Sequence, residues 1–158
     1  MSDARAARID LARARTIVDR AIGHARSNDF PPMTVAVFDT TARLVAFAGE
    51  DGSSLLRERI TRGKAHGALK HGRRQSLAAR AAARTAFINS VVALTDGDLV
   101  PAVGGVLVRD HDNNVIGAVG VSGSLPDDDE ACAIHGIAAA GLRADPGAAD
   151  PTGSSHPY

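Results

Sequence analysis

Apolar residues recur with a helical period over residues 8–27, and arginines occupy the opposite face of that segment. This pattern predicts an amphipathic helix, which Pro31 and Pro32 would end because proline cannot continue a helix. Two short runs rich in valine and phenylalanine follow, over 34–39 and 43–49, separated by the turn Thr-Thr-Ala. These runs predict a β-hairpin. The first run is nearly continuous in apolar residues, so both faces of that strand should be covered.

The rest of the chain also alternates between helical and strand-like patterns. Ser53 or Ser54 is a natural N-cap for one helix, and Ser76 for the next. A turn rich in Asp and Asn joins two later Val-rich runs into a second hairpin. Four acids open the last helix, where the helix dipole favours negative charge. The expected elements are helices over 55–72, 77–94 and 127–144, and strands over 103–110 and 114–123.

The predicted order of elements is α-β-β-α-α-β-β-α. Hairpins with helices between them indicate an antiparallel sheet with helices packed on it, an α/β fold of the α+β type. The length of 158 residues fits one domain, which we place at residues 1–143. Residues 144–158 contain Pro, Gly and Ser without an apolar period, so we expect them to form a disordered tail.

Composition and charge narrow the function classes. Acidic and basic residues balance at 18 each, whereas a nucleic-acid-binding protein would show a basic excess, so no nucleic-acid partner is expected. The single cysteine, Cys132, excludes an intramolecular disulfide and a cysteine-based metal cluster, and the histidines show no metal-ligand spacing, so no metal site is predicted. The sequence shows neither a secretory signal nor the ~18 consecutive apolar residues of a membrane span. A soluble, cytoplasmic protein without a membrane partner is therefore expected.

The segment 115–136 raises the question of a site, because four acids, a lone cysteine and a histidine follow a Gly-rich strand end. Residues 127–130 are either the solvated first turn of a surface helix or the wall of a site, and the pattern leaves both interpretations open. His135 is expected on or beside a buried helical stripe, where a histidine is more often a core residue than a ligand. Cys132 is expected to be a small buried residue rather than a nucleophile. The predicted stripe comprises Ala131, Ile134, His135, Ala138 and Leu142.

Lys64 is expected near the inward face of its predicted helix. A partly buried ammonium group needs a carboxylate partner or an anionic ligand, although a lysine that snorkels at the edge of the core would show the same spacing. His66 and His71 follow on the same helix, but five residues apart they do not share a face. Gly104 and Gly105 lie within a strand pattern, where they indicate a bulge or a close approach of a ligand to the backbone.

Together these motifs resemble a known family. The hairpin MTVAVFDTTARLVAFAGEDG, the triplet GKA, and VGGVLVRD with NNVIGAVGVSGSLPDDDEACAIHGIAAAG are similar to the GlcG/HbpS family, also called haem-degrading domain proteins, and to the C-terminal domain of PduO-type proteins. The resemblance covers about residues 8–143. It implies a profilin-like fold with a central antiparallel sheet, and homo-oligomers from dimers to octamers. It also implies a ligand, since family members have been linked to haem or corrinoid binding.

The family pattern further implies one pocket near a subunit interface. Asp129 and Glu130 would face Lys64 across it, and a carboxylate beside an ammonium group in a partly dry cleft could act as an acid or a base. The chain departs from the family at His66 and His135, where many relatives have other residues. The remaining residues that the resemblance assigns to the pocket are Asp51, Gly52, Gly104, Gly105, Ser122 and Gly123.

Three function classes remain open from the sequence. The first is an oligomeric protein that binds haem, another tetrapyrrole or a small organic metabolite. Its candidate iron ligands are His66, His71 and His135. Haem is the cofactor that the resemblance suggests, although the sequence is poor in the aromatic residues that a haem slot would use.

The second class is a cofactor-independent isomerase, lyase, hydrolase or cyclase of a catabolic or biosynthetic pathway. Lys64 would then stabilise an oxyanion, Asp129 or Glu130 would move a proton, and His135 or His66 would be the second acid or base. The third class is a scaffold or redox-stress accessory protein that binds no small ligand.

Overall fold

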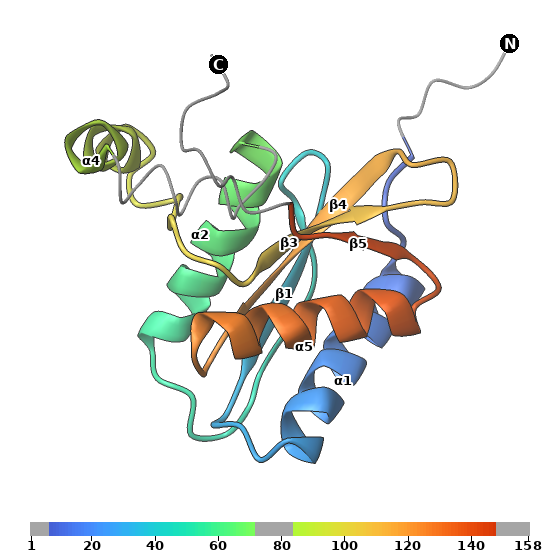
Figure 1. Ribbon diagram of the computed structural model, residues 1–158. Coiled ribbons are helices and arrows are strands. Elements are labelled where there is room, and N and C mark those ends of the chain that lie inside the picture. Colours follow the sequence, from blue (N-terminus) through green and yellow to red (C-terminus); the bar gives the residue numbers. More distant parts are fainter. Residues whose placement is uncertain (1–6, 72–83, 148–158) are drawn as a thin grey trace, which may run out of the picture.

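The structure, a computed structural model, describes residues 7–71 and 84–147. Its strands are β1 (Thr34–Asp39), β2 (Leu44–Gly49), β3 (Gly105–Arg109), β4 (Val115–Ser122) and β5 (Arg143–Asp145). Within the described residues they form one antiparallel sheet in the order β2-β1-β4-β3-β5 (Figure 1). All six residues of β1 are buried, as the unbroken apolar run predicted, because β1 lies inside the sheet and helices cover both of its faces.

Helices α1 (Leu11–Ser27) and α5 (Pro126–Ala139) pack on each other and on one face of the sheet, while α2 (Leu56–His71) covers the opposite face. Figure 1 shows this three-layer arrangement, with α4 (Thr85–Leu94) beyond α2 at the edge of the molecule. Helix α1 begins where the side chain of Asp10 accepts a hydrogen bond from the backbone N–H of Arg13. Its buried side chains recur at helical spacing and face the sheet: Ala14, Ile17, Val18, Ala21 and Ala25.

The two faces of the sheet carry different amounts of apolar material. The larger cluster fills the space between the sheet and the pair α1 and α5, and it includes Ile17, Val119 and Ile137. The cluster under α2 is smaller and rich in alanine. Helix α2 can lie this close because Gly120 of β4 has no side chain, and a Cβ there would collide with the carbonyl of Thr61.

The predicted order of elements is confirmed, and the structure adds one strand that the sequence analysis did not predict. The last helix was expected to continue to residue 144, but it ends at Ala139. Gly141 has φ +73°, and the N–H groups of Gly141 and Leu142 donate to the carbonyls of Ala138 and Ile137, which is a Schellman motif. The chain then pairs with β3 as β5.

The domain boundary predicted at residue 143 therefore falls inside a strand. Residues 144–147 belong to the folded part, where Ala144 and Asp145 pair with β3, so the expectation that they start a disordered tail is corrected. The rest of that expected tail, residues 148–158, lies outside the described residues, and so do residues 77–83 of the helix predicted over 77–94. Across the described residues, no helix has the length and apolarity needed to cross a membrane.

Candidate functional site

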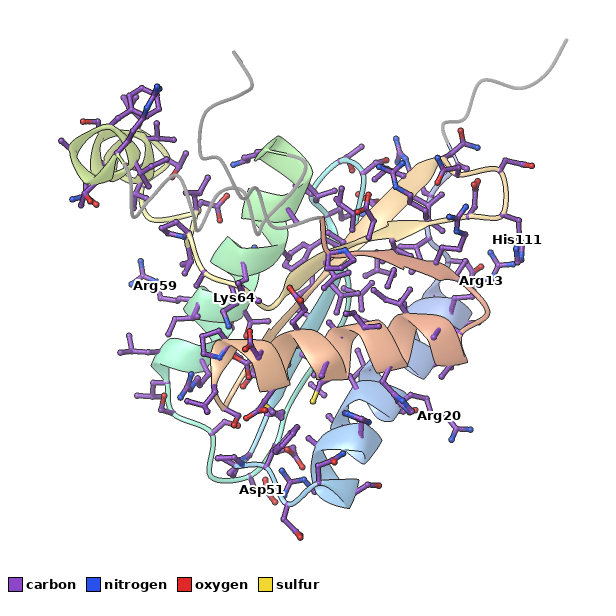
Figure 2. The ribbon with its side chains drawn as sticks, viewed as in Figure 1. Arg13, Arg20, Asp51, Arg59, Lys64 and His111 are labelled. Atoms are coloured by element: carbon purple, nitrogen blue, oxygen red, sulfur yellow. The ribbon has the colours of Figure 1, made fainter. Side chains whose placement is uncertain are left out.

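Lys64 of α2 and Asp129 of α5 meet at the end of the sheet, although their helices cover opposite faces. The Lys64 Nζ atom lies 2.7 Å from Asp129 Oδ2 and donates a second hydrogen bond, 3.0 Å long, to the carbonyl oxygen of Val121. Their side chains are only 4% and 2% exposed. Figure 2 shows Lys64 between α2 and the start of α5. The sequence prediction that these two residues face each other therefore agrees with the geometry.

Gly104 provides the space for this ion pair. It has φ +113°, and a Cβ at this position would lie 2.7 Å from Lys64 Nζ and 2.9 Å from the carbonyl oxygen of Val121. A side chain would be strained by the backbone conformation and would also displace the ammonium group. The sequence indicated a bulge or a close approach of a ligand here, whereas in the structure the group that approaches Gly104 is the Lys64 ammonium group. The next residue, Gly105, is buried and opens strand β3 opposite Gly120.

The acidic first turn of α5 has one buried carboxylate and other carboxylates at the surface. Asp129 is buried, and its second oxygen accepts a hydrogen bond of 2.9 Å from the backbone N–H of Ser124. Burial raises the pKa of Asp129, and this effect outweighs the lowering by Lys64. Asp128 accepts a hydrogen bond from the Ser124 hydroxyl, whereas Asp127 is exposed. The first turn is therefore solvated on one side and joined to Lys64 on the other. Glu130 is half-buried on the same helix.

The other residues expected in the pocket do not all join this cluster. Ser122 is buried and accepts a hydrogen bond of 3.0 Å from Arg57 of α2. Gly123 lies against Met33, and a Cβ on it would collide with the Met33 sulfur. Asp51 is exposed and stands apart from Lys64 in Figure 2.

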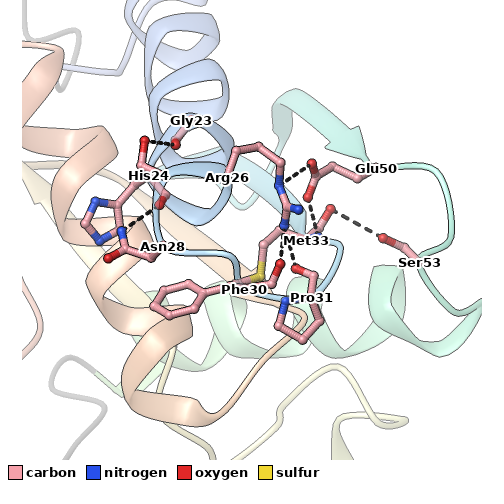
Figure 3. A network of polar contacts seen from close by, with 10 residues as sticks. Gly23, His24, Arg26, Asn28, Phe30, Pro31, Met33, Glu50 and Ser53 are labelled. Carbon is pink, nitrogen blue, oxygen red and sulfur yellow. Dashed lines mark hydrogen bonds and ion pairs between the residues drawn. The ribbon is translucent and has the colours of Figure 1, made fainter.

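The turn that contains Asp51 and Gly52 is anchored next to Met33, as Figure 3 shows. The Met33 N–H donates to the Glu50 carboxylate over 2.6 Å, and the Ser53 hydroxyl donates to the Met33 carbonyl. These contacts place Asp51 and Gly52 in a surface turn. Within the described chain, the predicted pocket residues thus lie partly around the ion pair and partly in the turn beside Met33, and a common pocket stays a prediction.

A different cluster forms around His66, which points from α2 toward the loop that follows α4. His66 Nδ1 lies 2.6 Å from Asp98 Oδ2, and Lys70 Nζ donates to the same oxygen over 3.2 Å. The His66 side chain is nine-tenths buried, with its ring edge-on to Phe38 at a centroid distance of 4.6 Å. The other ring nitrogen, Nε2, is buried and has no hydrogen-bond partner among the residues that the structure describes.

Asp98 is the residue of this cluster that sequence reasoning missed. It stands in the segment TDGDLVPA, which reads only as a loop. The loop is fixed on α2 by a hydrogen bond of 3.1 Å from the Val100 N–H to the Gly63 carbonyl, and Leu99 is buried against Ile88. The pair of acids in a Gly-containing loop gave no signal about which of them would reach α2.

His135 lies outside both clusters, which corrects the expectation that it shares a buried stripe. It is exposed and stacks on His24 of α1, with ring centroids 4.6 Å apart. Burial and the charge of His135 lower the pKa of His24. The buried positions of α5 are Asp129, Cys132, Ala133, Gly136 and Ile137. Cys132 is buried as predicted, and burial raises the pKa of its thiol to about 12, so the thiol is unreactive. The side chain of His71 lies outside the described part of the structure.

A surface groove of about 400 Å³ lies between α1 and β2 and is lined by residues such as Arg15, Asp19 and Phe47. Its lining contains none of the residues that the sequence analysis assigned to a site.

Comparison with known proteins places these features in a family. Residues 9–138 match the family described as haem degrading protein HbpS-like. The chain belongs to the HbpS-like family. The curated proteins gave no match.

Solved structures share the HbpS-like fold at low sequence identity. A PduOC:heme complex has a TM-score of 0.77 and 18% identity, covering 87% of this chain and 99% of the other. HbpS has a TM-score of 0.72 and 22% identity, covering 87% and 93%. The ORFY protein of Klebsiella pneumoniae has a TM-score of 0.75 and 18% identity, covering 89% and 97%. These similarities confirm the α/β fold that the sequence predicted.

Proposed function

We propose that this protein binds haem or a closely related iron tetrapyrrole, with His66 Nε2 as the iron ligand. The observation that carries the proposal is the state of this atom: it is buried, it has no partner among the described residues, and its ring is held by Asp98 on the other side. The description of the HbpS-like family and the haem complex of PduOC support the choice of ligand.

The chemistry of the donor set fits such a group. An ionised carboxylate can only accept hydrogen bonds, so Asp98 requires the proton on His66 Nδ1, and in the neutral ring Nε2 then presents a lone pair. A buried acceptor without a partner costs about 1–3 kcal/mol, and an iron ligand bond would remove that cost. One histidine would suffice to hold such a group, because the tetrapyrrole brings its own nitrogen donors for the iron and His66 would add one more. The apolar ring of Phe38 lies beside this position. When bound, haem would supply a redox-active iron.

The test is a haem titration of the purified protein followed by its Soret absorption band. The wild type is expected to give a saturable shift of the band, and His66→Ala is expected to bind at least about tenfold more weakly, with an altered spectrum. His111→Ala is the matched control, because His111 is exposed in the turn between β3 and β4 and stands far from His66's helix in Figure 2. Equal binding by wild type and His66→Ala would contradict the proposal.

The enzymatic alternative depends on Lys64, Asp129 and Glu130. The polar atoms of Lys64 and Asp129 bond to each other and to the backbone, and their side chains are almost fully buried. This geometry favours a structural role for the ion pair, because a substrate would have to open it first. The His66 cluster therefore carries the proposed function.

We also propose that the protein is a homo-oligomer, as the family resemblance implies, and that it is cytoplasmic. Large apolar side chains on the surface support the first part: Leu55 is 98% exposed, Leu94 85% and Leu125 70%. Light scattering after size exclusion should give a multiple of the 16.3 kDa chain mass, and a monomer at that mass would contradict it. A ligand site near a subunit interface stays a prediction.

A further inference from the structure

We propose that Asp98 is a positioning residue for His66: its carboxylate holds the imidazole in the form that carries its proton on Nδ1, so that the Nε2 lone pair stays available to a metal. The identity of that metal, the iron of haem, rests on the proposed function. The effect of Asp98 on the position of the imidazole proton does not depend on the proposed function, because it is a property of the ligand-free protein.

The geometry of the carboxylate supports this role. One oxygen, Asp98 Oδ2, accepts hydrogen bonds from His66 Nδ1 at 2.6 Å and from Lys70 Nζ at 3.2 Å. His66 and Lys70 stand one turn apart on α2, so they present their donors on the same helix face. The His66 side chain is 6% exposed and the Asp98 side chain 32%, so the carboxylate lies at the rim and the imidazole inside.

The charge on Asp98 is secured by the same contacts. An aspartate carboxylate is ordinarily ionised at neutral pH, and the two donors of His66 and Lys70 converge on one of its oxygens. Asp98 is therefore ionised at neutral pH and cannot donate a proton to the ring. A neutral His66 then has its proton on Nδ1.

The loop that carries Asp98 is held in place independently of the imidazole. The Val100 N–H donates to the Gly63 carbonyl over 3.1 Å, and a Cβ on Gly63 would lie 2.6 Å from the Val100 side chain. Buried Leu99 anchors the same loop. Asp98 is thus presented to His66 before any ligand arrives, which is the arrangement of a carboxylate that orients a metal-binding histidine.

The experiment compares the wild type with Asp98→Asn. The asparagine amide can donate to Nδ1, so the form of His66 with its proton on Nε2 becomes accessible. Asp96→Asn is the matched control: Asp96 is exposed in the same loop, at φ +52°, and the change removes the same charge. Long-range ¹H–¹⁵N NMR of the ligand-free proteins reports which nitrogen of His66 is protonated, and a haem titration of each reports affinity.

We expect Nδ1 to be the protonated nitrogen in the wild type and in Asp96→Asn, and Asp98→Asn to shift the population toward Nε2–H. Haem affinity should fall about 10–100-fold in Asp98→Asn alone. An unchanged population of the two forms in Asp98→Asn would overturn the inference, and so would a measurable wild-type haem affinity that Asp98→Asn retains in full. If the population shifts as expected but the wild type binds no haem, the positioning role stands and the proposed function fails.

Discussion

At the scale of single residues, the buried ion pair between Lys64 and Asp129 is costly to break. Lys64 and Asp129 are almost fully buried and lie 2.7 Å apart. Removing one member of such a pair leaves the other charge without compensation in the interior, which is more destabilising than the pair itself is stabilising. The pair therefore fixes how α2 and α5 meet at the end of the sheet.

Lys64→Ala should lower the free energy of unfolding by about 3–5 kcal/mol at neutral pH. Lys70→Ala should cost less than about 1 kcal/mol, because the Lys70 side chain is 43% exposed and its ion pair is screened by water. Urea denaturation of both variants measures the difference. The loss of unfolding free energy caused by Lys64→Ala should become smaller at acidic pH. Asp129 is protonated there, so it carries no charge that Lys64 would have to neutralise. A Lys64→Ala deficit no larger than that of Lys70→Ala would contradict the account.

The sequence could indicate Lys64 and Asp129 but not Asp98. Lys64 stands in a regular helical pattern and within a family motif, so both spacing and resemblance pointed to it, whereas the resemblance alone singled out Asp129 among the four acids. Asp98 stands in a loop, where neither periodicity nor spacing says which way a side chain points. Its contact with His66 depends on how that loop docks on α2, which follows from Leu99 and Val100 packing in three dimensions.

At the scale of elements, α5 shows why the predicted stripe was wrong. The stripe was built from apolar residues and included His135. The observed stripe begins at a charged residue, Asp129, and continues at spacings of three and four through Cys132, Ala133, Gly136 and Ile137. A search for apolar periodicity omits Asp129 because a buried carboxylate requires a partner from another element. Gly136 is buried because α1 approaches closely there, within reach of the Ile17 carbonyl.

The close packing of α2 on β4 gives an element-scale prediction. Gly120→Ala should be destabilising by about 1–3 kcal/mol, because the new methyl group meets the Thr61 carbonyl and pushes α2 from the sheet. Gly23→Ala is the control on α1, where a Cβ meets nothing within 4 Å, and it should stabilise by about 0.5–1 kcal/mol. Thermal unfolding distinguishes the two. Changes in stability of equal size and the same sign for Gly120→Ala and Gly23→Ala would contradict the close packing of α2 on β4.

At the scale of the whole molecule, the order of helices and strands followed from local patterns, because each element has a clear period or a clear turn. The strand β5 could not be predicted in this way, because a segment of three residues is too short to show a period. The sequence feature that could have indicated β5 is Gly141, because a glycine at this position can end the helix before residue 144. The resemblance supplied a list of site positions, and whether these positions share one pocket stays a prediction, because local patterns do not determine how distant segments come together.

The proposed ligation of haem iron by His66 can be tested by resonance Raman spectroscopy of the ferrous haem complex. We expect an iron–histidine stretching band that shifts when the histidines carry ¹⁵N, is retained in His111→Ala and is lost in His66→Ala. A wild-type complex without such a band, or a band that persists unchanged in His66→Ala, would contradict the claim.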